Sequence, residues 1–400
     1  MSTSASPTAV AAAPESGRIA KTAGYYIAYV VLGLTSTIIG PTLPGLAAHT
    51  HAAIGAASVL FAAHWTGYLF GTILGGRIYD RVPGHPVIVG VLLAMTAMMA
   101  TVPFVSILWL LAAVLLVLGV GEGILDVGGN TLLVWVHREK VAPFMNGLHF
   151  FVGVGSFLSP FVVARTMLAT GDALHAYWVL AVLMLPACFW LGRLPSPRAS
   201  AVDGDRGDGR PDPILVLLIA AFFFTFAGAE VAFGGWIYTY AREQGLETAT
   251  SAAYLNSAYW GAFALGRLLG IALAARLAPR TMLAADLVGC LASLGLMLAS
   301  PVSQAAVRVG ALGFGFFIAS MFATALVFAG RRMRITGKVT GYFLIGASFG
   351  TICLPWLIGQ LFEPVGPEAA LIVIAADMLV SLAVFAALGV YRPRPAPTEA

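Results

Sequence analysis

The amino-acid sequence predicts an all-α membrane protein with twelve transmembrane helices arranged in two six-helix halves. Of its 400 residues, 59% are hydrophobic and 10% are charged, whereas a soluble domain carries about 25% charged residues. A soluble fold could not bury this much apolar surface. The apolar residues form twelve runs, each at least as long as the ~17 residues that a membrane-spanning helix needs. A polar segment divides these runs six and six, and the second six repeat features of the first.

The polar segment between the halves is rich in Asp, Arg, Gly and Pro, a composition typical of a solvated linker. We therefore predict a disordered cytoplasmic tail over residues 1–22, an N-terminal bundle over 23–194, a linker over 195–213, a C-terminal bundle over 214–391 and a tail over 392–400. The predicted spans are 23–47, 58–79, 87–104, 106–135, 141–169, 176–194, 214–240, 252–277, 281–300, 307–330, 335–362 and 369–391.

Basic residues set the predicted orientation. Of the 22 Lys and Arg residues, 18 fall at one set of alternating span ends, and such ends face the cytoplasm. Both termini and the linker are therefore predicted to be cytoplasmic. The preference for Arg, Ala and Gly suggests a bacterium, so we expect a multi-pass protein of a bacterial inner (plasma) membrane. The first 18 residues lack the basic start of a signal peptide.

Composition also limits the partners. The net charge of +4 is explained by cytoplasmic loops, so we expect a lipid bilayer and a small-molecule substrate as partners and no nucleic acid. The three cysteines lie far apart within apolar runs and support neither a disulfide framework nor a zinc site. No nucleophile–base set or phosphate loop is recognisable. We expect a monomer that is not an enzyme and needs no cofactor or metal apart from a coupling ion.

A shift of 195 residues relates the two halves. The pairs at this spacing run through two spans and their loop: Gly33/Gly228, Gly40/Gly235, Leu60/Leu255, Trp65/Trp260, Gly71/Gly266, Leu74/Leu269, Gly75/Gly270 and Arg81/Arg276. A constant offset of this kind implies parallel six-helix repeats. This arrangement resembles that of the major facilitator superfamily, in which the substrate binds near mid-membrane between the halves.

The fourth apolar run contains the most unusual stretch, residues 119–130, with two carboxylates and an amide. Glu122, Asp126 and Asn130 are spaced at i, i+4 and i+8, so they share one helix face. A charge in hydrocarbon costs at least ~2.5–3.5 kcal/mol, and such groups usually face a bundle interior or a water-filled path. The stripe is therefore a candidate site.

The loop after the second span reads Gly76-Arg-Ile-Tyr-Asp-Arg-Val-Pro-Gly84. It resembles the major facilitator loop signature G-x-L-a-D-R-x-G-R-R, with one residue added and with His85-Pro86 in place of the closing basic pair. In the family, this aspartate and basic residue latch the halves on the cytoplasmic side in the outward-facing state. The resemblance implies a gating latch at Asp80 and Arg81; the alternative is that they only cap and orient a helix end.

Three further strings resemble the fucose-permease branch of the superfamily, which includes sodium-dependent glucose transporter-like proteins. They are Gly123-Ile-Leu-Asp-Val-Gly-Gly-Asn-Thr131, Met145-Asn-Gly-Leu-His149 and Gly228-Ala-Glu-Val-Ala-Phe-Gly-Gly-Trp236. The resemblance implies import of a small polyhydroxylated solute, usually a monosaccharide, coupled to protons or sodium. Asp126 occupies the position of the branch's acidic fourth-span residue. The first-span acid of fucose permeases is absent between Thr35 and Pro44.

Three acids are the candidates for cation coupling. Asp126 comes first, because an acid whose exposure changes during gating can link cation binding to transport. Glu122 lies one turn away and would titrate with it as a unit, or the two could provide the oxygen ligands that sodium prefers. Glu230 has Thr35 as its counterpart in the first half and could bind substrate or ion. The alternative for all three is a buried partner for Arg267 or a helix-to-helix hydrogen bond.

Polar and aromatic residues near these acids are candidates for substrate binding. The set is Asn130, Asn146, His149, Glu230, Trp236, Asn256 and Tyr259. Amides and the imidazole could bind sugar hydroxyls, and an aromatic ring suits the apolar side of a pyranose, although each could equally serve helix packing. Two more acids within spans, Asp286 and Asp377, are expected to be paired structural groups.

The predicted function is secondary active transport by alternating access, with cation-coupled symport of a sugar-like solute as the leading hypothesis. A proton-linked efflux antiporter of drugs or metabolites is the alternative. Such proteins commonly carry an Arg in the fourth span, where this chain has only acids. A membrane receptor or a lipid-handling protein forms a third class that remains open at this point.

Overall fold

The computed structural model describes residues 15–197 and 212–391. Within these residues, eleven helices are long and apolar enough to span a membrane, and a bent pair forms a twelfth span. The helices of the first half are α1 (Glu15–Ser36), α2 (Ile39–His49), α3 (Ile54–Ala57), α4 (Val59–Tyr79), α5 (Gly84–Thr101), η1 (Val102–Phe104), α6 (Leu108–His137), η2 (Arg138–Lys140), α7 (Ala142–Thr170) and α8 (His175–Gly192).

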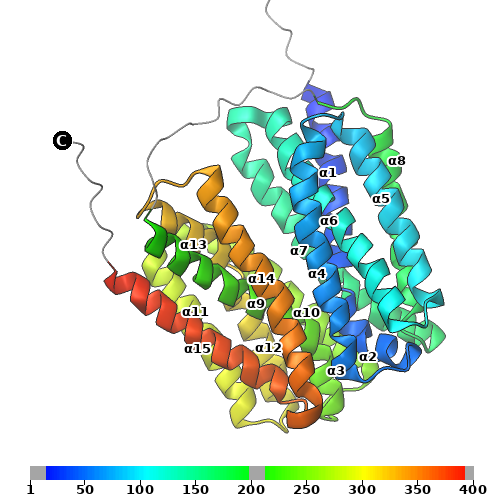
Figure 1. Ribbon diagram of the computed structural model, residues 1–400, viewed down its shortest axis with the longest axis vertical. Coiled ribbons are helices and arrows are strands. Elements are labelled where there is room, and N and C mark those ends of the chain that lie inside the picture. The colour runs from blue at the N-terminus through cyan, green and yellow to red at the C-terminus, as the bar shows by residue number, and fades with distance from the viewer. Residues whose placement is uncertain (1–14, 198–211, 392–400) are drawn as a thin grey trace, which may run out of the picture.

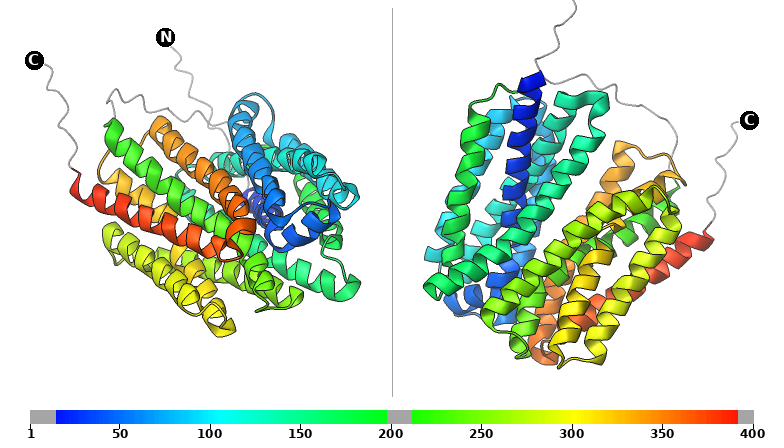
Figure 2. Two further views of the ribbon diagram at one scale, coloured as in Figure 1. Left: turned by 60° about the horizontal axis from the view of Figure 1, so that its bottom comes forward. Right: turned by 180° about the vertical axis from the view of Figure 1, so that it is seen from behind.

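The helices of the second half are α9 (Pro213–Glu243), α10 (Ala249–Ala274), α11 (Pro279–Ala299), α12 (Gln304–Ile318), α13 (Met321–Gly330), α14 (Gly337–Val365) and α15 (Ala369–Val390). Figure 1 shows the two bundles side by side, and the views in Figure 2 agree. The prediction of an all-α fold with twelve spans is confirmed. Most of the predicted linker, and most or all of each predicted tail, lies outside the described residues. Residues 15–22, predicted to belong to the disordered tail, instead form the start of α1.

Glycines bring helices together at equivalent places in the two halves. A Cβ on Gly155 would lie 2.1 Å from the carbonyl oxygen of Val30, and a Cβ on Gly350 would lie 2.0 Å from that of Phe224. Because only glycine permits such an approach, α7 packs on α1 as α14 packs on α9. The two glycines are 195 residues apart, so the repeat in the sequence is also a repeat of helix packing.

The first span is broken between α1 and α2, which meet at a bend of 45°. Pro41 lacks the N–H that would bond the carbonyl of Thr37, and a proline at this position clashes with that carbonyl. The Thr37 hydroxyl donates instead to the Gly33 carbonyl oxygen at 2.9 Å. Such back-bonding favours a bend, and it leaves Ser36 at the break, facing α6.

The two halves contact each other at one end of the molecule, where α2 meets α9 and α3 meets α14. They also meet where α4 contacts α14 and along α7 and α10. The Gly55 amide donates to Glu363 Oε1 at 2.9 Å, and a Cβ on Gly55 would lie 2.3 Å from the Gly359 carbonyl oxygen. The bundles diverge toward the opposite end, where α1 begins and α8 ends (Figure 1). At that end Asp80 and Arg81 are exposed, without an ion pair to any described residue.

Candidate functional site

Asp126 lies near the middle of α6 at the centre of a hydrogen-bond network. Its Oδ1 accepts from the Tyr29 hydroxyl at 2.8 Å, and its Oδ2 accepts from the Tyr68 hydroxyl at 2.6 Å. Asn130 Nδ2 donates to Oδ1 at 3.1 Å and to the Tyr29 oxygen at 2.9 Å. The predicted face shared by Asp126 and Asn130 is thus observed, and helices α1 and α4 supply the other two donors. Both oxygens of this carboxylate therefore accept hydrogen bonds from neighbouring side chains.

Polar groups from both halves lie around this network. His149 on α7 packs edge-on against Tyr29, with ring centroids 6.3 Å apart, and it lies within electrostatic range of both Asp126 and Arg267. Arg267 on α10 stacks over the Phe263 ring at 4.4 Å and interacts electrostatically with Glu230 on α9. The structure therefore brings Asp126 and His149 of one half toward Glu230 and Arg267 of the other.

Glu122 is fully buried and lies one turn from Asp126, in a separate group with Ser36 and His64. The Ser36 hydroxyl donates to its Oε2 at 2.8 Å, and His64 Nε2 lies 3.2 Å from the same oxygen without hydrogen-bond alignment. Glu122 Oε1 and His64 Nδ1 are also buried with no hydrogen-bond partner among the described residues. The alternative of Arg267 as the partner of Glu122 is not observed, since His64 and Ser36 occupy that role.

Asn146 is exposed near the start of α7. A cleft of about 330 Å³ opens nearby, lined by Asn130, Thr131, Val134, Trp135 and Met145. It lies between α6 and α7 on the side where the bundles diverge. This cleft gives Asn130 access from that end.

Trp236 and Asn256 have different surroundings from the other predicted substrate residues. Trp236 is fully buried, donates from Nε1 to the Pro355 carbonyl oxygen at 3.0 Å, and stacks on Phe362 with centroids 5.0 Å apart. Asn256 is also fully buried and donates to the Gly234 carbonyl oxygen at 2.6 Å. Both are held between helices in this conformation, as in the packing alternative.

Tyr259 is buried beside the central group. Its hydroxyl donates to the main-chain oxygen of Glu230 at 2.9 Å. It therefore fixes the position of the helix turn that carries Glu230.

Five residues of these clusters are absent from the predicted site: Tyr29, Ser36, His64, Tyr68 and Arg267. His64 is 58 positions or more from every predicted site residue except Asp80 and Arg81, so no spacing rule links it to Glu122. Arg267 could have been identified from the sequence, because it is a charged residue within an apolar run. Within the described part of the chain, no three His, Cys, Asp or Glu side chains are grouped to hold a metal ion.

Comparison with known proteins agrees with this architecture. The family model described as Major Facilitator Superfamily matches residues 25–350. Mouse sodium-dependent glucose transporter 1A is 28% identical over 377 residues, covering 84% of this chain and 88% of its own length. The Xenopus laevis sodium-dependent glucose transporter 1 is 30% identical over 356 residues, covering 81% and 72%.

Solved structures share the fold at low sequence identity. The nucleoside transporter NupG (D323A mutant) superimposes with a TM-score of 0.74 at 13% identity, over 93% of this chain and 99% of that one. A bacterial homologue of the human lysosomal transporter Spinster, in an inward-facing and occupied conformation, gives 0.73 at 11%, over 94% and 98%. The family match and the duplicated six-helix packing show that this chain belongs to the Major Facilitator Superfamily and is a membrane transporter, not an enzyme.

Proposed function

We propose that the protein couples a cation gradient to the symport of a sugar or a similar small polyhydroxylated solute, by alternating access. The main support is the meeting of ionisable groups from both halves: Asp126 and His149 on one side, Glu230 and Arg267 on the other. A substrate bound between them contacts both halves at once, as alternating access requires. The relatives named sodium-dependent glucose transporters support the solute class.

In this proposal the substrate's hydroxyl groups bind a ring of donors and acceptors at the interface. Glu230 accepts and Arg267 donates from the second half, while His149 and Asn130 serve from the first. Arg267 suits this role because its planar guanidinium offers several donors in a fixed geometry. Asn146 lies on the same face of α7 as His149, one turn closer to the open end, and so acts during entry. Trp236 and Asn256 are outside the proposed site.

The cation acts at the α6 acids. Asp126 adjoins the proposed substrate site through Tyr29 and His149, so cation binding there alters the groups that the substrate contacts. Glu122 is the second candidate, because its oxygen without a hydrogen-bond partner has a place for a proton or for a sodium ion. Either cation offsets carboxylate charge that is costly inside a membrane.

The orientation predicted from the basic residues makes the divergent end cytoplasmic, so this conformation is inward-facing. Closing that end would bring Asp80 and Arg81 toward the second half, as the latch hypothesis requires. Opening the other end would separate α3 from α14. Transport consists of rocking between these arrangements.

Uptake by proteoliposomes tests the proposal. Hexoses, a deoxyhexose and a dye-like cation are offered with either a pH or a sodium gradient, and the gradient that drives saturable sugar uptake identifies the ion. Asp126→Asn should abolish gradient-driven accumulation while sparing substrate exchange, whereas Asp286→Asn, a matched change in another span, should retain both. Unchanged accumulation in Asp126→Asn would rule out Asp126 as the coupling acid. Dye movement driven by pH, without sugar uptake, would instead support efflux.

A further inference from the structure

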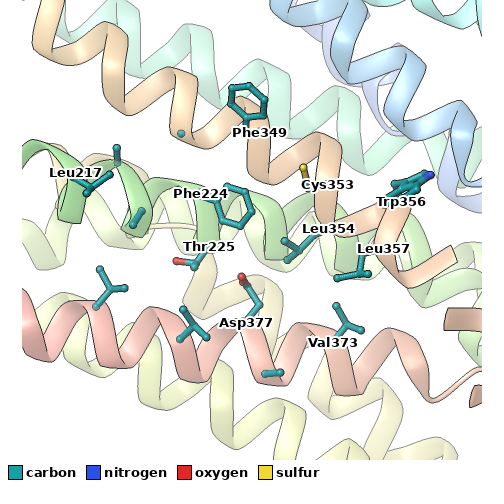
Figure 3. Close-up of a pocket in the computed structure, with 16 residues that line it drawn as sticks. Leu217, Phe224, Thr225, Phe349, Cys353, Leu354, Trp356, Leu357, Val373 and Asp377 are labelled. Atoms are coloured by element: carbon teal, nitrogen blue, oxygen red, sulfur yellow. The ribbon is translucent and has the colours of Figure 1, made fainter. Parts of the chain in front are cut away.

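A second cavity lies away from the interface, within the C-terminal bundle. It has a volume of about 880 Å³ and is bounded by α9, α14 and α15, as Figure 3 shows. This volume lies within the ~300–1,000 Å³ range of pockets for small organic ligands. Almost all of the lining is apolar, and several lining residues have large exposed fractions on the membrane-facing surface, including Leu217 (68%) and Val380 (54%). The cavity is therefore a groove open to the bilayer.

One charged side chain lines this groove. Asp377 lies on α15, nine positions into a 22-residue span, so it is at mid-membrane depth. Figure 3 shows its carboxyl group pointing into the space between α9 and α15, toward Thr225. The Thr225 hydroxyl is already used, because it donates to the Phe222 carbonyl oxygen of its own helix at 2.9 Å. Asp377 Oδ2 has no hydrogen-bond partner in the described part of the chain.

The fold itself does not need an acid at this position. The buried faces of α8 and α15 correspond when Leu180 is matched with Ile374 and Met184 with Met378. In that register the equivalent of Asp377 is Leu183, which is 45% exposed toward lipid. Asp286, the other acid expected to be structural, differs from Asp377 in having a partner, because the Ser320 hydroxyl donates to it. Asp377 thus replaces a lipid-facing leucine, and its Oδ2 acquires no hydrogen-bond partner among the residues that the structure describes.

We propose that this groove binds a lipophilic ammonium, a molecule with a hydrocarbon body and one protonated amine, which enters from the bilayer. The hydrocarbon body lies along the apolar walls formed by Leu217, Phe224, Leu357 and Val380. The ammonium group pairs with the Asp377 carboxylate and supplies the hydrogen bond that Oδ2 lacks. Charge complementarity selects the amine over the neutral acyl chains of bulk lipid, because an intramembrane carboxylate without a counter-charge is strongly disfavoured.

Tryptophan quenching in nanodiscs tests this site on the full chain. Trp356 lines the groove and is 43% exposed, so bromine on a bound ligand will quench it. The probes are a terminally brominated decylamine and the brominated decanol of the same length. Subtracting the signal of Trp356→Phe isolates this one of the eight tryptophans. We expect the amine to quench Trp356 at a mole fraction at least tenfold lower than the alcohol requires.

The variants decide between the amine site and ordinary lipid contact. Asp377→Asn should remove the preference for the amine, Asp377→Glu should retain it, and Val380→Phe, which fills the groove, should weaken quenching by both probes. Equal quenching by amine and alcohol in the native protein would overturn the proposal, as would an unchanged preference in Asp377→Asn. If Asp377→Asn does not fold, loss of the amine signal in Val380→Phe supports the site, and its persistence contradicts it. The readout is binding, so it is independent of the transported substrate.

Discussion

Replacing Gly55 by alanine should shift the protein away from the conformation described here. Gly55 lies in α3 at the end where the halves meet. Alanine is a better helix former than glycine, by about 1 kcal/mol, so the change does not harm α3 itself. In the closed arrangement, however, the new Cβ would lie 2.3 Å from the Gly359 carbonyl oxygen of α14. Only separation of the two helices relieves this contact.

The size of the shift follows from the cost of that contact. Overpacking of this kind costs typically ~1–3 kcal/mol, and the separation also breaks the hydrogen bond from the Gly55 amide to Glu363. Since ~1.4 kcal/mol is a factor of ten in an equilibrium, the closed end should open ~5- to 150-fold more often. The opening is measured with spin labels at His51→Cys and Val365→Cys, both exposed sites, in a protein whose native Cys188, Cys290 and Cys353 have been replaced. Opening of the closed end appears as a longer distance between the two labels.

A matched glycine on α14 controls for the substitution itself. A Cβ on Gly341 would meet nothing within 4 Å, so Gly341→Ala should leave the distance distribution unchanged. The reasoning is refuted if Gly55→Ala gives the same distribution as Gly341→Ala. It is also refuted if the labels move closer together.

Three further predictions follow from other contacts. Tyr68→Phe removes a 2.6 Å hydrogen bond to the Asp126 carboxylate, of a kind that contributes ~1.5–3 kcal/mol, so the cation concentration for half-maximal uptake should shift ~10- to 150-fold; a shift under twofold contradicts the coupling role. A double-mutant cycle of His64→Asn and Glu122→Gln, read by thermal unfolding in detergent, should give a coupling energy above ~0.5 kcal/mol, whereas additive effects would mean that the 3.2 Å pair contributes nothing. Hydrogen bonds from Arg308 hold the Glu247 pKa below its usual range; this stabilisation is therefore present above the ordinary pKa of Glu and is lost as pH falls through the lowered value. Arg308 is 53% exposed, so Arg308→Gln should lower stability at pH 7 by at most ~1 kcal/mol, and the difference in Tm should vanish in acid.

The arrangement of spans was predictable because it depends on local properties. Apolar run length identifies a span, and glycine at matching positions records close helix contacts, as with Gly33 and Gly228. The shared face of Asp126 and Asn130 also follows from helical spacing alone. Each of these features is determined within one helix or by the repeat.

The partners of the acids were not predictable, because they depend on the register between helices. His64 lies beside Glu122 because α4 and α6 approach closely at Gly119, where a Cβ would lie 2.0 Å from the His64 carbonyl oxygen. A glycine in an apolar run does not reveal which neighbouring turn it contacts. The position of Trp236, by contrast, could have been judged from helical spacing alone. It is six residues from Glu230, about 240° around the helix, so the two could not share a face.

The contacts of Glu122 suggest how a cation could influence the closed end. Ser36, which donates to Glu122, lies at the break between α1 and α2. Beyond that break, Gly40 on α2 approaches the other half so closely that a Cβ would lie 2.7 Å from the Gly234 carbonyl oxygen. A continuous chain of contacts therefore links a buried acid to the interface. Coupling is measured with Glu122→Gln, Gly40→Ala and the double variant in the spin-label distance assay. If the two sites are independent, their effects on the free energy of opening add within ~0.3–0.5 kcal/mol; a larger deviation shows that they are coupled.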